Sequence, residues 1–200
     1  MADSYTTLWT NDLCRELERS GEEGLRLTIL FGGPYGSQPS FLRAGVRPGD
    51  TIYPVRAHRT RLHVLGAMEV SRIVTHEEAG TELHDDDYAK LMYWRRLKTG
   101  FVSEVLLGPP GSPLSFDTVV PGDVLERLTF TSRRGERALR FVEDGRLTRS
   151  NGLQGVYRLA PASAAELRRL VAERFAGRRC ELADTRSGPL VGGEEPRVTI

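Results

Sequence analysis

The stretch Ala44-Gly45-Val46-Arg47-Pro48-Gly49-Asp50-Thr51-Ile52-Tyr53-Pro54-Val55 contains the clearest indication of the fold. Within it, Pro48-Gly49-Asp50 is a turn signal, and the β-branched and aromatic residues that follow are typical of a strand. A polar turn at 57–60 leads to a second β-rich run over 61–74. The pattern predicts an antiparallel β-hairpin in a highly curved sheet. Its predicted core residues are Ile52, Leu62 and Val64.

Upstream of this hairpin, the sequence predicts a helix, a strand and a loop. Apolar residues between 8 and 17 recur at helical spacing, with Thr10 or Asn11 as the cap. Alternating apolar residues over 25–31 predict a strand. The stretch 32–40 is too rich in glycine and proline for either element, so we expect a loop.

Downstream of the hairpin, short elements continue without the regular alternation of strands and helices that a doubly wound sheet requires. A helix is predicted after the acidic run 85–87, and a strand over 101–107. The stretch 124–131 is expected to be a strand, or a short helix followed by a strand.

Two turn signals and a capping box organise the C-terminal part. Asp144-Gly145 and Asn151-Gly152 are two-residue hairpin signals and predict a meander over 139–159. Ser163 and Glu166 form a capping box that predicts the last helix. The total of roughly six to eight strands and three helices favours an α+β protein built on a mixed β-barrel with flanking helices.

The length of 200 residues and the 39% hydrophobic content fit one domain with its own core. We expect a single α+β domain over 1–177 with a C-terminal elaboration, and a flexible tail over 178–200. Two cysteines, Cys14 and Cys180, exclude a disulfide framework and a cysteine-built zinc site. Since there is neither a bilayer-spanning apolar run nor a secretory signal at the start, we expect a soluble, cytoplasmic protein without a membrane partner.

The Gly49-Asp50 turn, the strand after it, and the following run Leu62-His63-Val64-Leu65-Gly66-Ala67-Met68-Glu69-Val70 resemble the core hairpin of the PUA-like superfamily. This superfamily includes the PUA, ASCH, EVE and YTH domains, and the match covers about 30 of the 200 residues. The resemblance implies a small PUA-like mixed β-barrel that holds RNA or a modified nucleobase. It places the ligand between the barrel and the segment before the hairpin, which is 32–41 here.

In that segment, glycines permit close approach of the backbone to a ligand, an aromatic ring can stack on a base, and a hydroxyl or amide can bond its edge. The alternative is an ordinary surface loop whose aromatic residues pack into the core. The candidate ligand-binding residues are Gly33, Tyr35, Ser37, Gln38, Phe41 and Tyr53.

Charges are segregated along the chain although the formal net charge is only +1. Residues 43–72 and 122–158 are basic, while 1–24 and 75–90 are acidic, and arginine supplies every basic residue except two lysines. Segregated charge predicts a continuous basic surface for phosphates, with ordinary solvated arginines as the alternative. Its predicted members are Arg56, Arg59, Arg61, Arg133, Arg134, Arg137 and Arg140.

These observations favour a nucleic-acid-binding protein that reads a modified base or RNA. The alternatives are a small ASCH-like hydrolase acting on a nucleoside or RNA, and a protein-interaction module. ASCH hydrolases use a lysine with a glutamate or threonine, whereas Lys90 and Lys98 lie in or near the predicted helix after 85–87, so the sequence leaves catalysis undecided. We expect no cofactor and no metal, because helix capping explains the consecutive acids. The oligomeric state and the choice between RNA and DNA stay open.

Overall fold

The computed structural model of this chain describes residues 2–33, 39–82 and 102–184. Its helices are α1 (Asn11–Arg19), α2 (Phe41–Ala44), α3 (His76–Glu82), α5 (Gly122–Arg127), the 3-10 turn η2 (Asn151–Leu153) and α6 (Pro161–Asp184). Its strands are β1 (Ser4–Leu8), β2 (Ile29–Gly32), β3 (Thr51–His58), β4 (Arg61–Val64), β5 (Met68–Glu69), β6 (Arg72–Thr75), β7 (Glu104–Leu107), β8 (Thr129–Ser132), β9 (Gly135–Ala138), β10 (Val142–Glu143), β11 (Arg146–Leu147) and β12 (Val156–Arg158).

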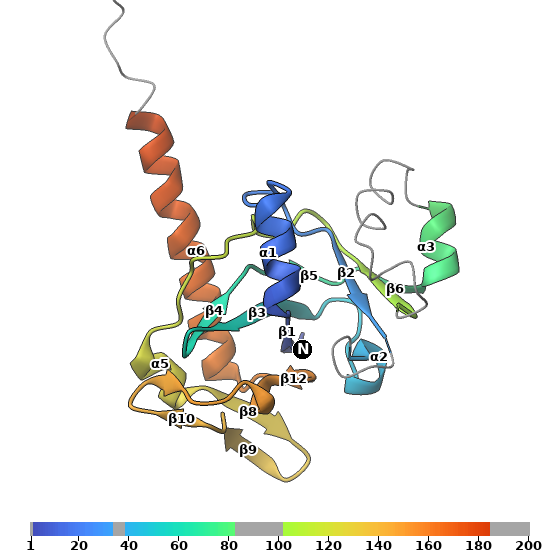
Figure 1. Cartoon of the computed structure of the whole chain (residues 1–200). Helices are drawn as coiled ribbons and strands as arrows, with labels where there is room; N and C mark the ends of the chain where they lie inside the picture. Colours follow the sequence, from blue (N-terminus) through green and yellow to red (C-terminus); the bar gives the residue numbers. More distant parts are fainter. Residues whose placement is uncertain (1, 34–38, 83–101, 185–200) are drawn as a thin grey trace, which may run out of the picture.

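The main sheet has the order β12-β1-β3-β4, with β5 also paired to β3. Within it, β1 and β3 run parallel, from Ser4 opposite Thr51 to Leu8 opposite Val55, and the other pairs are antiparallel. The strands β2, β7 and β6 form a second sheet, and β8–β9 and β10–β11 are separate pairs (Figure 1). The protein is therefore α+β, as predicted. The predicted mixed β-barrel is wrong for the described residues, whose strands form several sheets and no closed barrel.

The predicted hairpin is confirmed by the antiparallel pairing of β3 with β4. Its core residues Ile52, Leu62 and Val64 are at most 1% exposed. However, the second run is not one strand over 61–74, because β6 leaves the main sheet and pairs with β7. The chain changes course at Gly66, where a Cβ would lie 2.7 Å from the Leu27 side chain.

Strand β3 separates two hydrophobic cores because successive side chains of a strand point to opposite faces. On one face, Tyr53 and Val55 pack in a core that we call the α6 core, whose other members include Leu128, Phe130 and Leu167. On the other face, Ile52 packs in the α1 core, together with residues that include Cys14 and Leu17 of α1. Figure 1 shows α1 and α6 on either side of the β3–β4 region.

Several local predictions can be compared with these elements. Helix α1 is capped as expected, since the Thr10 hydroxyl accepts a hydrogen bond from the Leu13 amide at 3.2 Å. The strand β1 was not predicted, because its residues are mostly polar. The stretch 124–131 is a short helix followed by a strand, α5 and β8. The helix predicted after 85–87 lies outside the described residues.

The C-terminal part differs from the predicted meander. The β10–β11 hairpin turns at Asp144-Gly145, which have φ of +48° and +68°, as that signal predicts. Strand β12, however, pairs with β1 instead of β11. Helix α6 starts at Pro161, before the predicted cap, and the Ser163 hydroxyl instead accepts a hydrogen bond from the Thr129 amide at 2.9 Å. Helix α6 continues to Asp184, and 185–200 lie outside the described residues.

No described helix has the length and apolar character needed to cross a membrane.

The turn before β3 is held by a buried carboxylate. Asp50 is 5% exposed, and its two oxygens accept hydrogen bonds from the backbone amides of Asp3 and Arg47, each at 2.8 Å. Gly49 supplies the positive φ of +91°. The turn predicted from Gly49 and Asp50 is therefore confirmed, and it also attaches the start of β1 to the hairpin.

Replacing Asp50 with alanine should lower the free energy of unfolding by about 2–4 kcal/mol, because two backbone amides lose a charged acceptor. Urea denaturation followed by circular dichroism measures the change. The matched control is Asp123→Ala, which removes an exposed ion pair with Arg127 and should cost no more than about 0.5 kcal/mol. Equal costs for the two variants would contradict a structural role for the Asp50 carboxylate.

Candidate functional site

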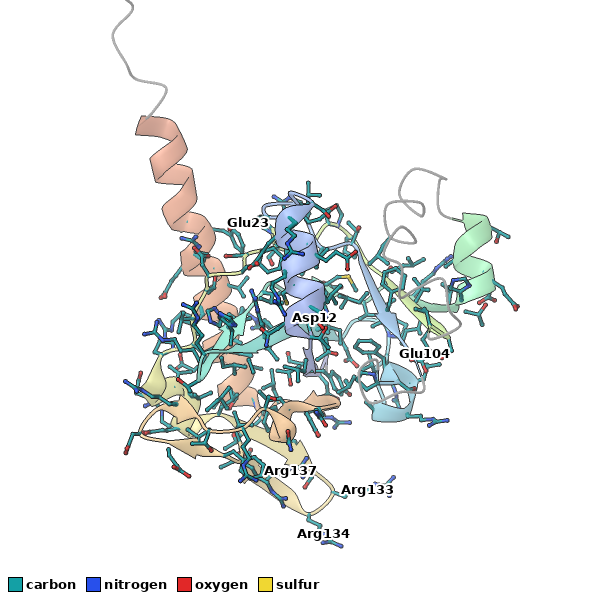
Figure 2. The ribbon with its side chains drawn as sticks, viewed as in Figure 1. Asp12, Glu23, Glu104, Arg133, Arg134 and Arg137 are labelled. Carbon is teal, nitrogen blue, oxygen red and sulfur yellow. The ribbon has the colours of Figure 1, made fainter. Side chains whose placement is uncertain are left out.

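Three of the predicted surface arginines lie on the β8–β9 hairpin, which we call the arginine hairpin. Arg133 and Arg134 form its turn, and Arg137 of β9 lies directly opposite Phe130 of β8. Figure 2 shows Arg133 and Arg134 pointing away from the body at the tip, with Arg137 further along the strand. All four residues of β9 are exposed. The hairpin therefore presents its cations to solvent.

The hairpin turns and attaches to the body through identifiable contacts. Gly135, with φ of +104°, ends the turn, and the Ser132 hydroxyl donates a hydrogen bond to the Gly135 carbonyl at 2.8 Å. On its inner side, β8 contacts the chain directly after β12 through a bridge between Phe130 and Leu159. Phe130 itself is 3% exposed and belongs to the α6 core. The cationic tip is thus mounted on a packed base.

Carboxylates do not neutralise most of this cationic surface. In the described part of the chain, Arg133, Arg134 and Arg140 have no ion-pair partner, whereas arginines elsewhere, such as Arg127 and Arg169, are paired. The acid within the hairpin is Glu136, which accepts a long hydrogen bond of 3.4 Å from the Thr129 hydroxyl. Among the acids labelled in Figure 2, Asp12 lies in the first turn of α1, and Glu23 lies beyond the far end of that helix, away from the arginine hairpin.

A cavity of about 290 Å³ adjoins the arginine hairpin, and we call it the aromatic pocket. It is formed where β8 and β9 meet the segment after β9 and the segment from η2 to β12. The lining combines aromatic rings, guanidinium groups and one amide. The residues concerned are Phe130, Arg137, Arg140, Phe141, Asn151 and Tyr157.

The rings of the aromatic pocket are paired with cations. The Phe130 and Tyr157 rings lie 5.5 Å apart between centroids, and the Arg137 guanidinium lies 5.4 Å from the Tyr157 centroid. The Arg149 guanidinium lies 5.7 Å from the Phe141 ring. Both distances are within the range of cation–π attraction. The pocket therefore has π faces and positive charge in one place.

Tyr157 depends on a glycine two residues earlier. Gly155 has φ of +132°, and a Cβ there would lie 3.1 Å from the Tyr157 ring. Only glycine adopts that backbone conformation without strain, and a side chain at this position would also crowd the Tyr157 ring.

Replacing Gly155 with alanine should lower the free energy of unfolding by about 1–3 kcal/mol and shift the NMR signals of the Tyr157 ring, since strain and contact act together. The control is Gly24→Ala, where φ is +89° and nothing lies within 4 Å of the added Cβ. The control should cost less and leave the Tyr157 signals in place. Unchanged Tyr157 signals in the Gly155 variant would contradict the proposed support of the pocket.

The other predicted surface arginines lie elsewhere. Arg59 lies in the β3–β4 turn and Arg61 at the start of β4, and both are exposed. The Thr60 carbonyl between them accepts a hydrogen bond from the Leu147 amide of β11. A second cavity, of about 470 Å³, opens there and includes Thr60, Glu143, Asp144 and Arg146. Its mixed charge is less suited to an anion than the surface of the arginine hairpin.

The assignment of Arg56 to the basic surface is corrected by the structure. Arg56 is 5% exposed, and its guanidinium donates hydrogen bonds to Asn11 at 2.9 Å and to Glu18 at 2.7 Å. The Arg56 guanidinium therefore connects β3 to α1 and is not part of the exposed basic surface. The adjacent β3 and β4 positions place His58 and His63 with ring centroids 6.4 Å apart.

Burial lowers the pKa of His63 below its usual 6.5, and the charges of Arg56, His58 and Arg61 act in the same direction against a backbone hydrogen bond with Phe116. Burial also lowers the pKa of His58, again with Arg56 contributing. The unfolded chain therefore takes up protons at higher pH than the folded protein does.

As pH falls below 6.5 toward the lowered folded-state values, the unfolding free energy should decrease. It should be fully retained only well above 6.5, where these two side chains are neutral in both states. Urea titrations at pH values between about 5 and 8 measure the slope. The double variant His58→Gln, His63→Gln should show a flatter dependence, and an unchanged slope would contradict this assignment.

The pocket predicted between 32–41 and Tyr53 stays a prediction, because Tyr35, Ser37 and Gln38 lie outside the described residues. Gly33 is buried. Phe41 and Tyr53 are each 1% exposed and belong to different cores, so neither ring presents a face to solvent. Burial raises the pKa of Tyr53, while a hydrogen bond with the Arg168 side chain opposes that rise.

A buried carboxylate fixes the chain immediately after the expected loop. Glu104 of β7 is 8% exposed, and it accepts hydrogen bonds from the Phe41 amide at 2.8 Å, the Leu42 amide at 3.2 Å and the Ser40 hydroxyl. Figure 2 shows Glu104 beside α2. These contacts cap α2, and they explain why the Glu104 carboxylate can be buried. In the ranges 2–33, 39–82 and 102–184, no group of three or more His, Cys, Asp or Glu side chains is placed to hold a metal ion.

The pocket residues Phe141, Asn151 and Tyr157 were not predicted from the sequence. The available signal was the interleaving of aromatic residues with arginines between 130 and 158, a pattern typical of nucleic-acid surfaces. Sequence spacing alone does not show that three separated segments meet in one cavity.

No protein-family model and no curated protein matches this sequence. Among solved structures, a hypothetical protein from Leishmania major is similar at 13% identity, with a TM-score of 0.43, over 87% of this chain and 97% of that chain. An ASCH protein from Zymomonas mobilis is similar at 12% identity, with a TM-score of 0.39, over 82% of this chain and 93% of that chain. A mutant of the Zymomonas mobilis protein is similar at 13% identity, with a TM-score of 0.32, over 72% of this chain and 91% of that chain. At such low identities and TM-scores, these likenesses assign neither a family nor an activity.

Proposed function

We propose that this protein binds nucleic acid through the arginine hairpin. The observation that carries the proposal is the exposure of Arg133 and Arg134 at the hairpin tip without any carboxylate partner among the described residues. Guanidinium groups bind phosphate oxygens through paired donors, and unpaired exposed arginines keep those donors available. Arg137 and Arg140 extend the cationic surface toward the aromatic pocket.

The proposal also retains a PUA-like arrangement for this chain. Its support is the Gly49-Asp50 turn and the β3–β4 hairpin, the features on which the sequence resemblance depends. An RNA or a modified base as the ligand would be consistent with that arrangement. The alternatives, an ASCH-like hydrolase and a protein-interaction module, have no specific observation in their favour among the described residues, from which both Lys90 and Lys98 are absent.

The test compares two alanine double variants in binding to fluorescently labelled single-stranded RNA and DNA at several salt concentrations. Arg133→Ala, Arg134→Ala should weaken binding to oligonucleotides of any sequence. It should also reduce the slope of log K against log salt by about 1.4, because two phosphate contacts are removed from a single strand. Fluorescence anisotropy measures both quantities, and circular dichroism verifies that the variant is folded.

The matched control is Arg43→Ala, Arg47→Ala, which removes the same charge from exposed positions in and after α2. It should leave the slope unchanged. If both double variants bind like the unaltered protein, the arginine hairpin does not bind phosphates. Its charges then serve to discourage pairing of the exposed β9 edge with another chain.

A further inference from the structure

We infer that the aromatic pocket receives one unpaired base of the nucleic acid whose phosphates contact the arginine hairpin. This inference rests on the proposed function and adds to it the kind of ligand that the pocket takes. It concerns a cavity separate from the segment 32–41, where the sequence placed the ligand.

The volume of the pocket limits the size of the occupant. Pockets for small organic ligands usually enclose about 300–1,000 Å³, and this one encloses about 290 Å³. It therefore suits a single base with part of its sugar, and it is too small for two stacked nucleotides.

The lining chemistry selects an aromatic group attached to negative charge. Phe141 and Tyr157 offer π faces, and Arg137 and Arg140 offer positive charge, while no carboxylate lines the pocket. The side-chain amide of Asn151 can both donate to and accept from the edge of a base. A nucleotide combines a π face, an edge with donors and acceptors, and an adjacent phosphate.

The position of the pocket on the hairpin connects it to the proposed phosphate contacts. Arg137 belongs to both, since it lies on the exposed strand β9 and its guanidinium covers the Tyr157 ring. Arg133 and Arg134 lie at the tip of the same hairpin (Figure 2). A single-stranded nucleic acid whose phosphates follow the hairpin from its tip therefore reaches the pocket at Arg137.

Phe141 is held in a costly conformation at this pocket. Its φ of +62° is unusual for an aromatic residue, and 39% of the residue is exposed. The backbone is held there because the Phe141 carbonyl accepts hydrogen bonds from the Thr148 amide at 2.8 Å and from the Thr148 hydroxyl at 3.2 Å. Strained residues of this kind gather at binding sites. The result is a partly exposed aromatic ring beside the Arg149 guanidinium, at the edge of the pocket instead of within a core.

Stacking on the pocket requires an unstacked base, so the protein should prefer single strands to duplexes. The probes are a single-stranded oligonucleotide, the duplex of the same sequence, and adenosine and uridine 5′-monophosphates. The single strand should bind most tightly, and the monophosphates should bind more weakly because they lack the contacts at the hairpin tip. A duplex or a monophosphate that binds as tightly as the single strand would overturn the inference.

The decisive variant is Phe141→Ala. It should weaken binding of the single strand about tenfold or more, because one stacking platform is lost, and should leave the salt slope unchanged, because no phosphate contact is removed. The control is Leu42→Ala, which truncates another exposed apolar side chain, 58% exposed, on α2. The control should bind like the unaltered protein.

A second variant separates binding from folding. Asparagine tolerates a positive φ, so Phe141→Asn should raise the thermal midpoint while weakening binding as Phe141→Ala does. Normal binding by both Phe141 variants, together with weakened binding by Arg133→Ala, Arg134→Ala, would overturn the base pocket and leave the proposed function standing. Normal binding by all of these variants would overturn the proposed function as well.

Discussion

The burial of β3 on both faces is the constraint on which the rest of the structure depends. Every residue from Ile52 to Arg56 is buried, and the strand is paired on one edge to β1 and on the other to β4 and β5. A strand in this position needs apolar cover on each face. Helix α1 supplies one cover and α6 the other. The single charge on the strand, Arg56, is tolerated because Asn11 and Glu18 of α1 satisfy its guanidinium.

The candidate site is built outward from the α6 side of that strand. The Ser163 hydroxyl of α6 accepts from the Thr129 amide, and the Thr129 carbonyl accepts from the Ala160 amide at 3.0 Å. At the same open end of the hairpin, the Leu139 amide donates to the Leu128 carbonyl at 2.9 Å. These bonds fix the open end of the β8–β9 pair, the end opposite the Arg133–Arg134 tip. The exposed arginines and the aromatic pocket are therefore attached to the body through the open end of the hairpin.

The parts of the fold that were predictable are those with short sequence separation. A pattern within a short stretch of sequence was enough to predict the β3–β4 hairpin, the Gly49-Asp50 turn and helix α1. The strand β1 was not predicted, because Thr6 and Thr7 are buried although they are polar. In addition, β1 pairs with a strand far away in the sequence, as shown by Ser4 opposite Thr51. The predicted capping box at Ser163 placed the start of the helix too late for a related reason. The Ser163 hydroxyl accepts a hydrogen bond from Thr129 of β8, which is distant in sequence, instead of capping the helix. The aromatic pocket was missed because its walls come from three separated segments, although the arginines beside it could be identified from local charge.

The central position of β1 has a consequence for the order in which the chain can fold. The strand lies between β3 and β12, and its register to β12 joins Tyr5 to Arg158. During synthesis, β1 leaves the ribosome long before β12 exists, whereas the β3–β4 hairpin can close once β4, which follows β3 after a two-residue turn, has been made. Until β12 arrives, one edge of β1 carries unpaired amides and carbonyls. A nascent chain that stalls before residue 156 would therefore expose this edge of β1 as a template for pairing with another chain.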